Sequence, residues 1–342
     1  MLPLLYPPLI NHRSPLMTDC TQLLAEPIVF RAEMEHEEPN ESMEDADLEA
    51  SLKAIRESTY KNSGHARRSL HAKSHGILFG TFTVLENLPP MLAQGLFSKE
   101  GNYRAAMRFS TLPGMILKDS VSMPRGVALK VQGVQGDRLP GSSGNEQDFV
   151  MVDAPTFGAR TVKEFNEFVR SVVAKFTDES KGLEEPDNEI LGDTFYSQTP
   201  FLYGQYTCKF ALAPVSPSLR ARTNKHIEVS GKPNALRDSV VDYFAAQSGE
   251  WELKVQLNTD LESMPIEDST VSWPQDSSPY IAVGRLSVPA QDAWSSTSIA
   301  TVDDRMAFNP WNGLAAHRPL GSINRARKPT YAKSVTFRES HS

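Results

Sequence analysis

Several segments of this chain have the sequence pattern of β-strands, and they occur in groups with helical segments between them. The pattern is plainest at residues 252–257, where Leu253, Val255 and Leu257 alternate with polar residues. Such alternation is typical of a strand that buries one face. Segments rich in Val, Phe and Thr predict further strands at residues 76–86, 105–111, 125–132, 148–152 and 280–288. Strands grouped in this way, with helices inserted among them, predict an α+β fold built on an antiparallel β-barrel.

Helical patterns lie around these strands. Leu48, Leu52 and Ile55 recur at the spacing of one helix face. Helices are expected at residues 46–59, 162–176 and 236–246. Two segments that contain Gly and Pro are expected to be loops, at residues 133–144 and 178–193. At 342 residues the chain has the length of one large domain or two, and no internal repeat divides it.

The negative charge is concentrated near the N-terminus. The whole chain has a formal net charge of -7, yet residues 31–50 hold nine acidic residues against one basic residue, Arg31. The rest of the chain is therefore close to neutral. An acidic run of this kind is typical of a solvated, mobile arm, and less often of an arm that binds a partner. We expect residues 1–45 to be a flexible acidic extension and residues 46–342 to be the folded domain.

Composition excludes several classes of protein. The near-neutral body gives no electrostatic reason to expect nucleic acid binding. No apolar run approaches the length of a membrane span. Two cysteines, Cys20 and Cys208, provide no disulfide framework, which favours a reduced, cytoplasmic setting. The apolar N-terminus is broken by prolines and lacks a basic region, so we do not expect a signal peptide.

The segment Arg327-Lys-Pro-Thr-Tyr331-Ala-Lys-Ser-Val-Thr-Phe-Arg338 is chemically the most suggestive. If it is helical, Arg327 and Tyr331 share one face about one turn apart. An adjacent guanidinium favours the phenolate, and tyrosine is a known axial ligand of haem iron. Most Tyr/Arg neighbours are ordinary surface residues, so this pattern alone decides little.

A second set of motifs lies upstream. Arg67-Arg68-Ser69-Leu70-His71-Ala72-Lys73 is followed by Met107-Arg108-Phe109-Ser110-Thr111 and by Asp148-Phe149-Val150-Met151-Val152-Asp153-Ala154-Pro155-Thr156-Phe157. In this order, and with Arg-x-x-x-Tyr near the end, they resemble the core of the haem catalases. Segments 195–201, 264–273 and 317–325 are more similar to the small catalase-related proteins, which include minimal haem peroxidases and allene oxide synthases. The resemblance covers residues 48–342.

This resemblance implies a barrel with haem b held between it and the C-terminal helix. His71 would be the distal acid–base, and Ser110 would accept a hydrogen bond from its other ring nitrogen. Tyr331 would be the axial iron ligand, tuned by Arg327. The residues expected to hold the haem are Arg68, Arg108, Arg338 and Phe157. Without the motif the simpler explanation is favoured for each: a hydrogen-bonded histidine at a strand edge for His71, a strand serine for Ser110, surface ion pairs for the arginines and core packing for Phe157.

Three positions depart from the family pattern. Asp153 stands where the family has an asparagine that donates to bound peroxide, and an ionised aspartate only accepts. Either its pKa is raised by burial or the site handles another reaction. Leu70 replaces valine or threonine before the distal histidine, which argues mildly against an allene oxide synthase and narrows access. Pro329 is tolerated only in a first helical turn, so the helix is expected to begin near residues 327–329.

Three functions follow. The first is a haem-dependent peroxidase that acts on hydrogen peroxide or an organic hydroperoxide. The second is a biosynthetic enzyme on the same scaffold, either a fatty-acid hydroperoxide isomerase or dehydratase, or a peroxygenase; Asp153 favours it. The third is a non-enzymatic haem- or lipid-binding barrel, which requires the His71 and Tyr331 pair to be incidental. Larger catalases continue past this end point, which suggests a more open pocket and leaves homo-oligomer formation undecided.

Overall fold

The computed structural model describes residues 25–142, 144–175, 182–183 and 187–341. Its centre is a sheet of antiparallel strands in the order β5-β4-β3-β2-β1-β9-β8-β7-β6. Strand β5 also pairs with β7, so eight strands close into a barrel and β6 extends one edge of β7. The strands are β1 (Lys73–Val84), β2 (Gly101–Thr111), β3 (Arg125–Gln132), β4 (Glu146–Val152), β5 (Phe195–Tyr196), β6 (Phe201–Tyr203), β7 (Tyr206–Pro214), β8 (Gly249–Leu257) and β9 (Ile281–Val288). The predicted α+β barrel is confirmed.

The barrel interior is filled by one apolar core. In β8 the buried residues Trp251, Leu253 and Val255 alternate with partly exposed polar residues, as the sequence pattern predicts. Aromatic rings occupy the middle of this core, where Phe109 packs against Trp251 with ring centroids 6.2 Å apart. Closure of the barrel leaves few free strand edges and gives a rigid wall on which side chains can be placed.

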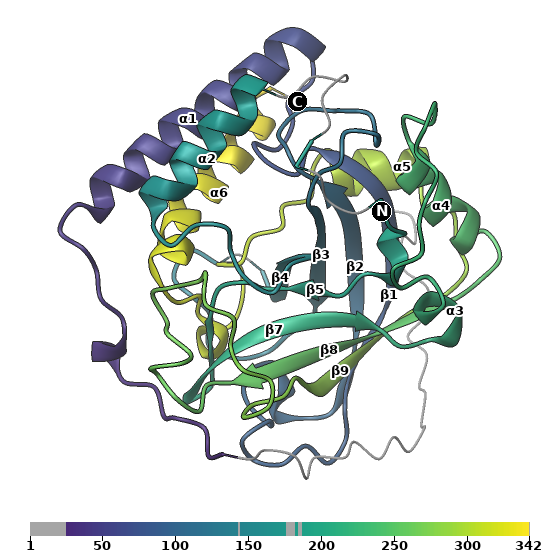
Figure 1. Ribbon diagram of the computed structural model, residues 1–342. Coiled ribbons are helices and arrows are strands. Elements are labelled where there is room, and N and C mark those ends of the chain that lie inside the picture. The colour runs from purple at the N-terminus through teal and green to yellow at the C-terminus, as the bar shows by residue number, and fades with distance from the viewer. Residues whose placement is uncertain (1–24, 143, 176–181, 184–186, 342) are drawn as a thin grey trace.

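Three long helices form a layer on one side of the barrel (Figure 1). They are α1 (Glu41–Ser63), α2 (Val162–Lys175) and α6 (Ser322–Ser340). The layer has a small apolar core of its own, which includes Leu48 and Leu52 of α1, Val162 of α2 and Ile323 of α6. The shorter helices α3 (Pro217–Arg220), α4 (Ala235–Phe244) and α5 (Ser296–Ser298) lie away from this layer (Figure 1). Among the described residues, none of the helices combines the length and apolar character that a membrane crossing requires.

The predicted helix at residues 46–59 starts too late and ends too early, because α1 spans Glu41–Ser63. Part of the acidic segment is also docked rather than solvated. Arg325 binds Glu41 through its Nε at 2.5 Å and Glu35 through its Nη1 at 3.2 Å. Composition alone predicts a free arm, because it cannot show that Arg325, far away in the sequence, binds these acidic residues. Residues 1–24 of the expected extension, Cys20 included, lie outside the described residues.

The predicted start of the C-terminal helix is also wrong. Helix α6 begins at Ser322 and carries Pro329 inside it. Its first turn is capped by Glu267, whose Oε2 accepts from the backbone N–H of Ser322 at 2.8 Å. Burial of Ile323 and Ala326 adds to the stability of these turns, which offsets the single backbone hydrogen bond that a proline removes.

Candidate active site

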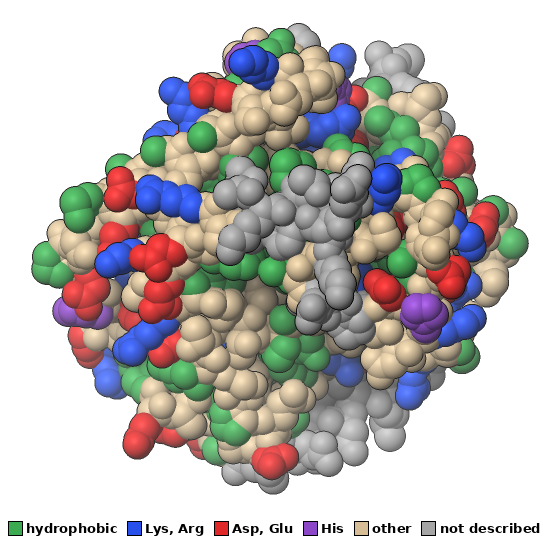
Figure 2. All heavy atoms as spheres, turned by 45° about the horizontal axis from the view of Figure 1, so that its top comes forward, with side chains coloured by type: hydrophobic (Ala, Val, Ile, Leu, Met, Phe, Trp, Pro, Cys, Tyr) green, Lys and Arg blue, Asp and Glu red, His purple; other side chains and the backbone are tan. Residues whose placement is uncertain are grey.

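A cavity of about 490 Å³ lies between the barrel and the helical layer. Its walls come from β2, β3, β4, the three long helices and the segment before β1. Cofactor and ligand sites measure roughly 300–1,000 Å³. Figure 2 shows hydrophobic side chains gathered in a hollow where the helical layer meets the barrel. The cavity brings together every site residue predicted from the sequence: His71, Asp153, Ser110, Arg68, Arg108, Phe157, Arg327, Arg338 and Tyr331.

His71 lies just before β1 with a φ of 52°, a left-handed conformation that non-glycine residues seldom adopt. The Oγ of Ser110 is 3.3 Å from its Nδ1 and donates to the carbonyl of Gly126 at 3.4 Å. Because the hydroxyl hydrogen is used at Gly126, Oγ accepts from Nδ1–H, and this assigns Nε2 as the unprotonated nitrogen. Among the described residues, none forms a hydrogen bond with Nε2.

The surroundings of His71 keep its imidazole neutral. Burial, reinforced by the positive charges of Arg108 and Arg327, lowers the pKa of His71 to about 3. Gly126 lets the ring approach the strand closely, since a Cβ at that position would come within 2.7 Å of Cε1. A neutral imidazole with one free nitrogen in a cavity is suited to accept a proton.

Tyr331 enters the cavity from the middle of α6, within the same continuous helix as Arg327. In the described part of the chain its hydroxyl has no hydrogen-bond partner. Burial lowers the pKa of Arg327, and the neighbouring Tyr331 opposes that shift. The Nη1 of Arg327 donates to Thr199 Oγ1 and Asn324 Oδ1, both at 3.1 Å. Its guanidinium is thus fixed beside a phenol that remains available as a ligand.

Phe157 forms part of the same wall. The guanidinium carbon of Arg327 lies 5.4 Å from the centre of its ring, and Phe165 of α2 packs on it with ring centroids 4.9 Å apart. The ring therefore contributes an apolar surface to the cavity and covers the charged Arg327.

Arg68 and Arg108 meet at one buried carboxylate, that of Asp303. The Oδ1 of Asp303 accepts from Arg108 Nε at 2.7 Å and from Arg68 Nη1 at 3.2 Å. The other nitrogen atoms of Arg68 include Nη2, which donates to the carbonyl of Met306 at 2.8 Å. Two guanidinium groups therefore share one negative charge at this end of the cavity.

Arg338 joins this cluster from α6. It is only 6% exposed, and its Nη1 donates to the carbonyl of Asp304 at 2.7 Å. Its Nε is buried without a hydrogen-bond partner in the described part of the chain. Among the described residues, Arg68 Nε and Arg108 Nη1 also have no hydrogen-bond acceptor. Each arginine thus keeps an N–H group for an anion, and the cluster is short of negative charge.

Asp153 directly follows β4 and lines the cavity, but its carboxylate binds Arg125. Its Oδ1 accepts from the backbone N–H of Arg125 at 3.0 Å, and its Oδ2 is 3.1 Å from Arg125 Nη2. Arg125 also binds Asp193 through Nε at 2.6 Å. Of the two explanations for an aspartate here, this ion pair favours the ionised acceptor over a neutral donor.

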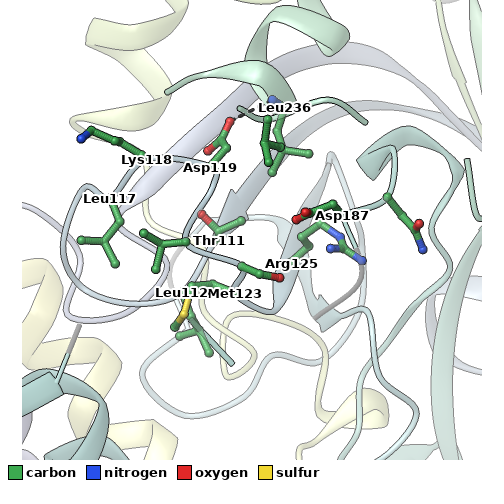
Figure 3. Close-up of a pocket in the computed structure, with 13 residues that line it drawn as sticks. Thr111, Leu112, Leu117, Lys118, Asp119, Met123, Arg125, Asp187 and Leu236 are labelled. Carbon is green, nitrogen blue, oxygen red and sulfur yellow. Dashed lines mark hydrogen bonds between the residues drawn. The ribbon is translucent and has the colours of Figure 1, made fainter. Parts of the chain in front are cut away.

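A second, much smaller cavity lies behind this ion pair. It measures about 20 Å³, which is enough for one water molecule, and is lined by Arg125, Thr111 and Asp119 among others (Figure 3). Asp119 accepts from the backbone N–H of Leu236 at 2.9 Å and from Lys73 Nζ at 2.5 Å. These contacts stabilise the packing of the loop at Asp119 against β1. The cavity itself is too small for a substrate.

A comparison with protein-family models finds the catalase family over residues 57–224. This range contains the segments of His71, Ser110 and Asp153. Over this range, which is just under half of the chain, the sequence is similar to the catalase family. A search of curated proteins finds no significant match.

Solved catalases share the fold. Catalase A from Saccharomyces cerevisiae aligns with a TM-score of 0.61 at 18% identity, over 82% of this chain and 63% of that one. A fungal catalase gives 0.62 at 17% identity, over 82% and 61%, and a bacterial catalase gives 0.60 at 18%, over 84% and 60%. The chain thus spans a little over three fifths of the length of these catalases.

The similarity to the catalase family implies a haem cofactor, and the cavity residues fit one. Haem carries two propionates. Within the described residues the arginine cluster has unpartnered N–H groups, and Asp303 is the one carboxylate in direct contact with it. In the described part of the chain the phenol of Tyr331 has no hydrogen-bond partner, and a free phenol in the cavity is chemically suited to ligate iron. The walls near Phe157 and Leu52 are apolar, as a porphyrin face requires.

Sequence reasoning missed two functional contributors. Asp303 holds Arg68 and Arg108, and Arg125 holds Asp153. A single acidic residue carries no spacing signal, so only its three-dimensional position identifies Asp303. Arg125 begins a predicted strand, and a charged residue beside the apolar positions Val127 and Leu129 is the sequence signal that points to it.

Proposed function

We propose that this chain is a haem-dependent oxidoreductase that acts on hydrogen peroxide or an organic hydroperoxide. One observation carries the proposal: neutral His71 and unpartnered Tyr331 line the same cavity from distant parts of the fold. Haem, when bound, supplies the iron at which the peroxide O–O bond is cleaved. The roles of the individual residues below are part of the proposal.

His71 would move the proton. Its Nε2 takes the proton from the bound hydroperoxide and returns it to the departing oxygen, which leaves as water or an alcohol. Ser110 keeps Nδ1 protonated and so keeps Nε2 available. General acid–base catalysis of this kind contributes about 10²–10⁴-fold to a rate.

Tyr331 would be the iron ligand and Arg327 would favour its phenolate form, because a fixed positive charge beside the phenol stabilises the anion. Arg68, Arg108 and Arg338 would bind the propionates through their remaining N–H groups. Phe157 would pack against the porphyrin. The type of haem proposed is haem b.

A second function on the same scaffold is favoured by Asp153. A carboxylate paired with Arg125 cannot donate to a bound peroxide, which weakens the case for rapid dismutation of hydrogen peroxide. The cavity also has apolar walls from Leu48, Leu52 and Phe168, which suit an acyl chain. This second candidate is a fatty-acid hydroperoxide isomerase or dehydratase, or a peroxygenase.

One experiment separates the two. The haem-loaded protein is supplied in parallel with hydrogen peroxide and with a fatty-acid hydroperoxide, and oxygen evolution is followed in the first and loss of the hydroperoxide in the second. Oxygen evolution as the dominant activity supports the first function, and rapid loss of the lipid hydroperoxide without oxygen supports the second. Failure of both reactions in a protein that contains haem would contradict both.

A further inference from the structure

Asp303 is a buried acidic residue that does not line the cavity, yet it contacts two residues that do. It ends the π-helical turn Ile299–Asp303, and its side chain is 8% exposed. Although burial opposes ionisation, the guanidinium groups of Arg108 and Arg68 hold the pKa of Asp303 below its usual value. Its carboxylate is therefore a permanent negative charge with a fixed position.

Arg108 connects this carboxylate to the main chain of His71. While Nε is held by Asp303, Nη2 donates to the carbonyl of His71 at 3.1 Å and to that of Ala72 at 3.2 Å. These carbonyls belong to the two successive peptide groups that follow the left-handed His71. A guanidinium is a rigid planar fork, so fixing one side of it fixes the other.

The conformation of His71 needs such support. A left-handed φ at a non-glycine residue costs of order 1–3 kcal/mol and persists only where the surroundings over-determine it. Gly126 confines the ring on one side, and Pro113 binds the N–H of Ala72 at 3.0 Å. Arg108 adds a charged group that binds the main chain at His71 and Ala72, and Asp303 orients Arg108.

We propose that Asp303 is a positioning residue for His71 and acts through Arg108. This inference rests on the proposed role of His71 as the acid–base. Without the carboxylate, Arg108 is free to turn toward an anion in the cavity and to release the two carbonyls. Proton transfer by His71 then becomes slower. The affinity for a porphyrin with two propionates is retained, because the arginine cluster has become more positive.

The test compares Asp303→Asn with Asp304→Asn. Asp304 is the adjacent residue, and its carboxylate binds the exposed His65 at 2.9 Å, so its loss removes one charge from the same segment without touching Arg108. Hydrogen–deuterium exchange of the apoprotein is followed over residues 66–76. We expect faster exchange there in Asp303→Asn and wild-type exchange in Asp304→Asn.

The haem-loaded variants give the second measurement. Asp303→Asn is expected to react with hydroperoxide at least about tenfold more slowly per bound haem, a part of the 10²–10⁴-fold that acid–base catalysis supplies. Its haem affinity is expected to equal or exceed that of wild type. Lower affinity with an unchanged rate per haem would overturn the proposal and assign Asp303 to cofactor binding instead.

Arg108→Lys keeps the charge but removes the fork, and it provides a second route if Asp303→Asn folds poorly. It is expected to speed exchange over residues 66–76 as Asp303→Asn does, and the double variant is expected to add nothing further. Additive effects would contradict action through Arg108. If the wild-type protein binds no haem, the proposed function fails, while the exchange measurements still decide whether Asp303 positions His71.

Discussion

Asp153 and Arg125 form a buried ion pair at the edge of the cavity, with Oδ2 of Asp153 3.1 Å from Nη2 of Arg125. Both partners are about 7% exposed, so the pair is shielded from water. The motif resemblance predicts a hydrogen-bond donor at this position, whereas an ionised carboxylate only accepts. This pair is the observation on which we base the proposal that dismutation of hydrogen peroxide is not the main reaction of the chain.

Asp153→Asn restores a donor at this position. We expect oxygen evolution from hydrogen peroxide to rise by up to about tenfold, the effect of one added hydrogen bond of about 1 kcal/mol. Oxygen-electrode rates per bound haem measure it. Asp193→Asn is the matched control, because it removes the other carboxylate of Arg125 without changing the cavity wall. Equal or lower oxygen evolution in Asp153→Asn would show that residue 153 does not govern the reaction.

His71→Gln removes the base and keeps a side chain of similar reach. The rate of reaction with hydroperoxide is expected to fall by about 10²–10⁴-fold, while haem remains bound through other residues. Because the pKa of His71 is depressed to about 3, the wild-type imidazole is neutral throughout pH 5–8. The pH–rate profile should therefore show no step from His71 in that range, and stopped-flow measurements at several pH values check both points.

Arg338→Gln removes one N–H donor of the arginine cluster. A charge-assisted hydrogen bond contributes about 1.5–3 kcal/mol, so haem should bind about ten- to hundredfold more weakly in a spectroscopic titration. The dimethyl ester of haem lacks both carboxylates, and wild type and variant should bind it equally. Arg285→Gln, which alters the barrel surface beside Glu252, serves as the control. If Arg338→Gln binds haem with wild-type affinity, Arg338 is not part of the cofactor site.

His317 links the stability of the fold to pH. It is completely buried, and burial lowers its pKa to about 4. Between pH 6.5 and 4 the unfolded chain binds a proton that the folded chain does not, so stability falls as the pH falls. From pH 6.5 to pH 5 this amounts to about 2 kcal/mol.

The check for His317 is urea unfolding of the apoprotein at both pH values. His317→Gln retains an acceptor for the backbone N–H of Leu96 and should lose this part of the pH dependence, whereas His65→Gln, at an exposed site, should keep it. An unchanged pH dependence in His317→Gln would mean that this histidine is not neutral in the folded state.

Much of the barrel follows from local sequence pattern. Alternation in β8, and the apolar and β-branched segments of β1 to β4 and β9, place those strands within a few residues. Strand β7 gives no such signal, because most of its residues are buried on both faces. Pattern methods depend on one exposed face, so a strand that is covered on both sides resembles any apolar segment.

The errors in the predicted starts of α1 and α6 have one physical origin, which is contact between segments distant in sequence. Glu267 caps α6 and moves its start to Ser322, and Arg325 binds the acidic residues before and in α1. Motif spacing located the residues that line the cavity. It did not reveal Asp303 or the pairing of Asp153, since both depend on which charge lies opposite in the folded chain.

The central claim is that Tyr331 and the arginine cluster hold haem in this cavity. Absorption spectra of the haem-loaded wild type, Tyr331→Phe and the control Tyr206→Phe test it most directly. The account predicts a ferric phenolate spectrum in wild type and in Tyr206→Phe, and its loss in Tyr331→Phe. A wild-type protein that takes up no haem, or a Tyr331→Phe variant with an unchanged spectrum, would contradict it.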